Sequence, residues 1–220
     1  IQNNCERLYT PTRNVSIDER MVASKARFPS RQYMKDKPIK WGFKLWVLAD
    51  SCNGYTYRFD IYAGKRHTIS NRGLSFDVVE RLMTPLFDQG YILYCDNFYS
   101  GPELFSFLHG RNTPAVGTVR ENRKGFPKTL ANKMPKKAPR GSIRWHRNGP
   151  LLFVQWQDTS NVNVLSTVHS GSGFGLVERN SKNKNTGEHV VQQISRPIAV
   201  KDYNENMGGV DLSDQHISYY

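Results

Sequence analysis

Three aspartates stand where predicted secondary-structure elements begin or end, with a fourth three residues beyond the last of them, and carboxylates in such places can support metal-dependent chemistry. Asp50 and Asp96 each follow an apolar, β-favouring run, whereas Asp211 and Asp214 open a predicted helix, three residues apart and on nearly the same face. Carboxylates gathered at one sheet edge repel one another unless a cation lies between them, and hard oxygen ligands select Mg²⁺ or Mn²⁺. Two such ions about 3.5–4 Å apart can activate a water or a 3′-hydroxyl in phosphodiester chemistry.

Each of these aspartates also has an ordinary structural explanation. Asp50 and Asp96 could be turn or cap residues, because Asp forms local hydrogen bonds with the backbone in such places. Asp211 and Asp214 could simply complement the positive end of a helix dipole. Residue spacing alone leaves the catalytic and the structural interpretations open.

The segment from Gly90 to Gly110 positions Asp96. Tyr91 to Cys95 predicts a short buried strand, and Ser100 with Glu103 has the spacing of a capping box that would begin a helix. Asp96 is therefore expected between the end of a strand and the start of a helix. In open α/β folds, ligands collect at that edge of the sheet.

The surrounding elements predict an α/β fold, with a mixed sheet flanked by helices. The expected order is a strand at 41–49, a strand at 55–63, a short strand at 67–70, a helix at 74–83, a strand at 91–95, a helix at 100–110 and a strand at 114–119. This is the order of an RNase H-like domain. In that layout the first and fourth strands are neighbours, so Asp50 and Asp96 are expected to lie side by side. Ser16 and Glu19 also have capping-box spacing, which predicts a short helix start.

The composition changes after Val119. From Arg120 to Arg147 the chain has ten Lys and Arg residues and a single acid, Glu121. Strands are predicted at 150–156, at 162–168 and near Val190. We therefore expect three segments. They are a first part of the core with a basic lead-in at 1–120, a β-rich insertion with its own basic lead-in at 121–196, and a return to the core carrying the third aspartate at 197–220.

The charge of the chain favours a polyanionic partner. The sequence has 31 Lys and Arg against 19 Asp and Glu, a net charge of +12, which points to nucleic acid before membrane. No long apolar run or basic amphipathic helix predicts membrane binding. The three cysteines have no C-x-x-C spacing, so neither a disulfide framework nor a zinc knuckle is expected. The residues predicted to bind DNA phosphates are Lys37, Lys40, Lys44, Arg120, Arg123, Lys124, Lys128, Lys136, Lys137 and Arg140.

Five segments of the chain resemble the piggyBac transposases and the proteins derived from them. They are SIDERMV (16–22), KPIKWGFKLWVLAD (37–50), YCDNFYSG (94–101), GTVREN (117–122) and YNENMGGVDLSDQ (203–215), in the family's order. The resemblance implies an RNase H-like catalytic core interrupted by a β-rich insertion. It also implies a metal site that maps onto Asp50, Asp96 and Asp211, with Asp214 as a supporting acid and Mg²⁺ or Mn²⁺ as the cofactor.

The same resemblance implies an activity and a setting. The family cuts DNA at transposon ends through hairpin intermediates and inserts at TTAA, which implies DNA as the partner, a homodimer in the full-length protein and a nuclear location. Ser24 to Arg27 replaces a Gly-Arg that family members often carry, and the family's N-terminal region and cysteine-rich C-terminal region are missing. We therefore expect this sequence to be an excerpt of a longer protein.

Three functions remain open on the sequence. The first is a metal-dependent transposase core, and the second is a domesticated relative that binds DNA or chromatin without cutting it. The third is a plain nuclease, which would share the site and lack only the joining step.

Overall fold

The structure is a computed structural model, and it describes residues 1–26, 29–35, 37–64, 70–128, 133–135, 137–182 and 189–219. The helices are α1 (Gln2–Leu8), α2 (Leu74–Met83), α3 (Pro102–Gly110), α4 (Ile198–Asn206) and α5 (Gly209–Ser218), with a 3₁₀ turn at Thr84–Leu86. The strands are β1 (Asn14–Ala23), β2 (Gln32–Tyr33), β3 (Trp41–Asp50), β4 (Thr56–Ile61), β5 (Ile92–Cys95), β6 (Ala115–Thr118), β7 (Ile143–Asn148), β8 (Leu151–Gln157), β9 (Asn161–Ser166), β10 (Phe174–Lys182) and β11 (His189–Pro197).

Within the described residues, nine strands form one mixed sheet. Its order is β2-β3-β1-β5-β6-β9-β8-β7, and β4 pairs with β3. The strands β1, β5 and β6 run parallel to one another, whereas the pairs toward both ends of the sheet are antiparallel. The mixed sheet with flanking helices confirms the predicted α/β, RNase H-like fold class. The strands β7, β8 and β9 continue this sheet, and the division of the chain into three segments stays a prediction.

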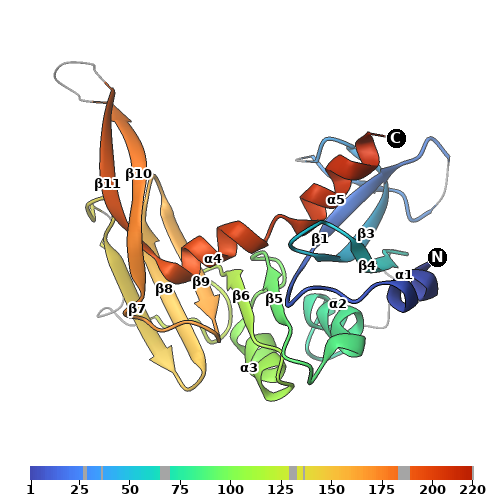
Figure 1. The fold of residues 1–220 in the computed structure, drawn as a ribbon, viewed down its shortest axis with the longest axis horizontal. Helices are drawn as coiled ribbons and strands as arrows, with labels where there is room; N and C mark the ends of the chain where they lie inside the picture. Colours follow the sequence, from blue (N-terminus) through green and yellow to red (C-terminus); the bar gives the residue numbers. More distant parts are fainter. Residues whose placement is uncertain are drawn as a thin grey trace.

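Helices cover both faces of the sheet. The helices α2 and α3 pack on one face over a core that includes Ile17, Leu48 and Cys95. The helix α4 packs on the other face against residues of β5, β6, β8 and β9, and α5 follows it over Val47 and Ala49. Figure 1 shows the red helices α4 and α5 along one side of the sheet and the green helices α2 and α3 on the other.

The strands β10 and β11 form a separate two-stranded ribbon that extends away from the sheet (Figure 1). The base of this ribbon is attached to β8, because Trp156 Nε1 donates a 2.7 Å hydrogen bond to the Ser195 carbonyl oxygen. Ile194 packs beside that contact in the same core as α4. Among the described helices, none is long and apolar enough to cross a membrane.

The helix start predicted at Ser16 to Glu19 is wrong, because these residues lie in the middle of β1. Val15 and Ile17 are fully buried and pack in the core, so hydrophobic burial on the sheet overrides the local capping pattern. The strand β1 lies between β3 and β5. It is an interior strand that pairs antiparallel with β3 on one side and parallel with β5 on the other.

The capping box predicted at Ser100 and Glu103 is also wrong in detail. The helix α3 begins at Pro102 with Gly101 at its N-cap and no side-chain cap. The Ser100 hydroxyl instead donates a 2.8 Å hydrogen bond to the Asp96 carbonyl oxygen. The short strand predicted at 67–70 falls mostly outside the described residues.

Candidate active site

Asp18 and Asp96 lie side by side where β1 and β5 run in parallel. Ile17 lies opposite Cys95 in this register, and each aspartate is the next residue along its own chain segment. Ile17 and Cys95 both pack in the core beneath α2 and α3. Since successive side chains of a strand alternate between faces, both carboxylates point to the opposite face, which α4 and α5 cover.

The two carboxylates are partly withdrawn from water. Burial raises the pKa of Asp18 to about 6, against the attraction of Lys37, whose Nζ lies 3.9 Å from Asp18 Oδ2. Burial and then the nearby charge of Glu19 raise the pKa of Asp96, although the Phe98 N–H donates a 2.8 Å hydrogen bond to Asp96 Oδ1. A divalent cation bound to both carboxylates would stabilise their charged forms, and it would offset both the cost of burial and the repulsion between the negative charges.

Thr118 and Tyr203 extend this row of polar groups. Gly117 lies opposite Cys95 on β6, so Thr118 stands beside Asp96 on the same face of the sheet. The Tyr203 hydroxyl on α4 lies 3.5 Å from Thr118 Oγ1. Burial raises the pKa of Tyr203 far above its ordinary value, so the phenol stays protonated near the two carboxylates.

The start of α5 brings Asp211 over the same face. Gly209 lies so close to Ser16 that an added Cβ would meet the serine hydroxyl, and Val210 packs with Val47. Val47 is the residue opposite Asp18 on β3. Asp211 is exposed and comes directly after this contact. The tertiary structure therefore assembles Asp18, Asp96 and the first turn of α5 on one face.

This donor set fits a hard divalent cation. Asp18, Asp96 and Asp211 offer only carboxylate oxygens, the ligands that Mg²⁺ and Mn²⁺ prefer, and the first two are desolvated together. In the described part of the chain, no group of three or more His, Cys, Asp or Glu side chains is close enough to hold a metal ion. Asp18 and Asp96 lie together, whereas Asp211 is exposed on the helix that packs over the same face and does not form such a group with them in this structure.

The predicted neighbourhood of Asp50 and Asp96 is wrong, because β1 separates β3 from β5. The fully buried Asp50 carboxylate instead accepts hydrogen bonds from Tyr9 Oη at 2.8 Å, Thr12 N at 2.6 Å, Thr12 Oγ1 at 2.8 Å and Cys52 N at 2.8 Å. Burial pushes its pKa up, but the hydrogen bonds from Thr12 and Cys52 outweigh it and hold the pKa below its ordinary value. The geometry gives Asp50 a structural role, that of anchoring the segment before β1.

Asp18 is the site residue that sequence reasoning missed. Its local sequence contains the signal of a strand, because Val15 and Ile17 alternate with polar residues. The capping-box spacing of Ser16 and Glu19 hid that signal. Asp18 becomes a partner of Asp96 only through the parallel pairing of β1 with β5.

Two of the predicted phosphate-binding residues form ion pairs with carboxylates of this chain. Lys44 Nζ lies 2.8 Å from Glu19 Oε1, and its side chain is only 16% exposed. Arg140 Nε lies 2.6 Å from Asp158 Oδ1, so this arginine holds the insertion together. The largely buried ion pair of Lys44 is at odds with its predicted contact with DNA, whereas the DNA contact predicted for Arg140, whose side chain is 26% exposed, stays a prediction. Lys136 lies outside the described residues.

Of the remaining predicted phosphate-binding residues, five are exposed and two are half-buried. Lys40, Arg120, Lys124, Lys128 and Lys137 are exposed. Lys37 is half-buried beside the Asp18 carboxylate and Arg123 is half-buried beside the loop that follows Asp96.

Arg120 and Arg123 connect the basic segment to the Asp96 loop. Arg120 Nε donates a 2.7 Å hydrogen bond to Asn97 Oδ1, and Arg123 donates to the carbonyl oxygens of Asn97 and Phe98. Together with Lys124 they line a cleft of about 520 Å³. Leu74 and Ser75 at the start of α2 and Phe98 also line this cleft, so its positive charge lies on the α2 side of the loop that follows Asp96.

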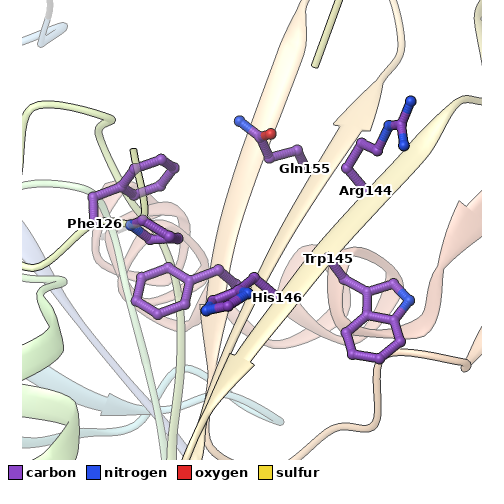
Figure 2. Close-up of a pocket in the computed structure, with 7 residues that line it drawn as sticks. Phe126, Arg144, Trp145, His146 and Gln155 are labelled. Carbon is purple, nitrogen blue, oxygen red and sulfur yellow. The ribbon is translucent and has the colours of Figure 1, made fainter. Parts of the chain in front are cut away.

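A second recess lies beside β7 and β8, where Figure 2 shows Phe126 and His146 near one another and Trp145 on the other side of β7. Its volume is about 10 Å³, room for about one water molecule and too small for a nucleobase. The Trp145 side chain is half-exposed and its ring lies against Gly171. We assign no ligand to this recess.

Comparison with known proteins gives the family. A family model described as Transposase IS4 matches residues 1–220. PiggyBac transposable element-derived protein 3 of Homo sapiens is 31% identical over 214 residues, which are 93% of this chain and 35% of that protein. PiggyBac transposable element-derived protein 2 of Homo sapiens is 29% identical over 198 residues, 87% of this chain and 33% of that protein.

A solved structure is similar as well. A piggyBac transposase in a synaptic complex with hairpin DNA matches with a TM-score of 0.79 and 28% identity, over 99% of this chain and 42% of that chain. The chain therefore belongs to the piggyBac-type transposase family, which confirms the resemblance seen in the sequence. It spans about a third of the length of the curated relatives.

Proposed function

We propose that this chain is the catalytic core of a metal-dependent DNA transposase, which cleaves phosphodiester bonds at transposon ends and joins them to TTAA targets. One observation carries the proposal. The carboxylates of Asp18 and Asp96, at adjacent parallel strands, are desolvated and on one face, and the helix that bears Asp211 packs on that face over β1 and β3. In a protein of a transposase family, desolvated carboxylates that lie side by side support a metal site.

Asp18, Asp96 and Asp211 would hold Mg²⁺ or Mn²⁺. When bound, such ions supply an activated oxygen nucleophile and stabilise the leaving oxygen. The chain's own contribution is to hold the three carboxylates in place and to keep Tyr203 protonated as a hydrogen-bond donor beside them.

The basic cleft beside the loop that follows Asp96 supports DNA as the substrate. Arg120, Arg123 and Lys124 would neutralise phosphates there largely independently of base sequence. The solved relative is a synaptic complex with hairpin DNA, which supports the same partner and transposon ends as the substrate. We further propose a homodimer in the complete protein and a nuclear location, because synapsis joins two DNA ends and chromosomal DNA is the target.

The test is cleavage and joining of a labelled transposon-end duplex by the complete protein with Mg²⁺. Asp96→Ala, Asp18→Asn and Asp211→Asn should each lower the rate by about 10³-fold or more, since a lost ligand removes several kcal/mol of transition-state stabilisation. Asp60→Asn, which removes an exposed ion pair with Arg81, is the matched control and should keep the wild-type rate.

The Asp50→Asn variant distinguishes two possible sets of metal ligands, one that contains Asp18 and one that contains Asp50. Its rate per folded molecule should stay within a few-fold of wild type if Asp18 is the ligand. A loss equal to that of Asp96→Ala would return Asp50 to the metal site. Full activity of Asp96→Ala would overturn the proposal altogether.

A second candidate function is DNA or chromatin binding without chemistry. What favours it is that the two curated relatives are named as transposable element-derived proteins, and their names claim no transposase activity. Salt-dependent DNA binding by the complete protein, with no product at any Mg²⁺ or Mn²⁺ concentration, would establish this candidate in place of the first.

A further inference from the structure

Arg20 is a buried cation that links the central strand to α5. It lies on β1, is 8% exposed, and its Nε donates to Asp214 Oδ1 on α5. Arg20 Nη1 donates a 3.2 Å hydrogen bond to Thr56 Oγ1 on β4, and Thr56 Oγ1 lies 2.9 Å from the Ser213 hydroxyl on α5. Three elements therefore meet at one guanidinium.

This link continues a row of contacts that holds α5 along β1. Gly209 lies against Ser16 at one end, and Arg20 holds Asp214 at the other. The helix thus runs beside the strand from Ser16 toward Arg20, consistent with the position of α5 next to β1 in Figure 1. Asp18 lies midway between these two anchors.

The two anchors place Asp211 over the stretch of β1 that holds Asp18. Asp18 is two residues before Arg20 on the same face of β1, about 7 Å along the strand. Asp211 is three residues before Asp214 on nearly the same face of α5, about 5 Å along the helix. A contact that fixes Arg20 to Asp214 therefore also fixes the approach of Asp211 to Asp18.

We propose that Arg20 and Asp214 are a positioning pair, which holds α5 so that Asp211 completes the metal site, and that Asp214 is not itself a ligand. This inference rests on the proposed metal site. It differs from the sequence-based assignment of Asp214 as a supporting acid, because the guanidinium already occupies one oxygen of that carboxylate and neutralises its charge.

The inference is tested by Mn²⁺ binding to the complete protein, followed by electron paramagnetic resonance. Arg20→Gln and Asp214→Asn should each weaken Mn²⁺ binding about 10-fold, the lower end of the loss expected when a group that orients a metal ligand is removed. The double variant should bind Mn²⁺ no more weakly than either single variant does, because the two side chains act as one unit. Asp211→Asn should weaken binding further than any of them.

The result for Arg20→Gln overturns or supports the pair. If Asp214 were a ligand, Arg20→Gln would bind Mn²⁺ as wild type does, while Asp214→Asn would lose affinity. Arg58→Gln is the matched control, because Arg58 is also a strand arginine that pairs with a helix carboxylate, Glu6 on α1 at 3.5 Å, although its side chain is only half-buried. It should leave Mn²⁺ binding unchanged.

Two further measurements cover poor folding and a failed metal site. If Arg20→Gln does not fold, Arg20→Lys keeps the charge but loses the two-point contact, and it should still weaken Mn²⁺ binding several-fold. Wild-type protein that binds no Mn²⁺ would overturn the proposed function. In that case, amide hydrogen exchange without metal would test whether Arg20 and Asp214 hold α5 in place. Faster exchange of α5 amides in Arg20→Lys and Asp214→Asn, but not in Arg58→Gln, supports it, and unchanged exchange overturns it.

Discussion

Asp18→Asn should make the metal-free protein more stable at neutral pH while abolishing its proposed chemistry. The Asp18 carboxyl has a pKa raised by burial from 3.8 to about 6. The difference between these two pKa values corresponds to about 3 kcal/mol. Asparagine has nearly the same shape and carries no charge to desolvate, so it avoids this cost.

The sign of the pH dependence follows from the raised pKa. Below about pH 4 the carboxyl is protonated in both the folded and the unfolded protein, so the variant should match wild type there. As the pH rises from about 4 through 6, the unfolded state ionises first and wild type loses stability. The variant should therefore gain about 3 kcal/mol over wild type at pH 8.

Urea unfolding in EDTA at pH 4 and pH 8 measures this difference, with the fluorescence of the buried Trp46 and Trp156 as the signal. Mg²⁺ should then stabilise wild type but not the variant, since the ion replaces the missing counter-charge. A variant equally or less stable than wild type at pH 8 would show that Asp18 is not held desolvated, and would refute the reasoning.

Three other predictions follow from the same contacts. Asp50→Asn should destabilise the protein by about 2–3 kcal/mol at pH 7, because it weakens hydrogen bonds to a buried carboxylate. Since the pKa of Asp50 is lowered, its contribution in wild type should disappear as the pH falls below about 4, which urea unfolding across pH can check. Gly117→Ala should cost about 3 kcal/mol in thermal unfolding, because the new methyl would overlap a buried serine hydroxyl and the carbonyl of the neighbouring strand. The double variant Arg123→Gln, Lys124→Gln should lower the slope of log affinity against log salt for duplex DNA by about 2, whereas Lys201→Gln on α4 should leave it unchanged.

Much of the fold was predictable from local patterns. The alternation in β4, the apolar face of α2 and the turn residues around Asp96 are strong signals, and all three elements form where they were expected. The start of α5 was likewise predicted. The elements α1, β7, β10 and α4 were not predicted, and β1 was predicted wrongly, because a capping-box spacing and a strand pattern compete over the same residues. Burial on both faces of a central strand decides that competition, and no local pattern reports it.

The sequence by itself determined that Asp96 ends a buried strand, that Asp211 begins a helix and that the chain is basic. Only the tertiary structure decided which carboxylate meets Asp96. Parallel strands pair over long sequence separations, so the choice of β1 over β3 as the neighbour of β5 is made by packing of the whole sheet. Because of that choice, Asp50 lies away from Asp96 and accepts hydrogen bonds from Thr12 and Cys52, and Asp18 lies beside Asp96. It also turns Lys44 and Asp214 toward Glu19 and Arg20 respectively, contacts that no spacing along the chain could specify.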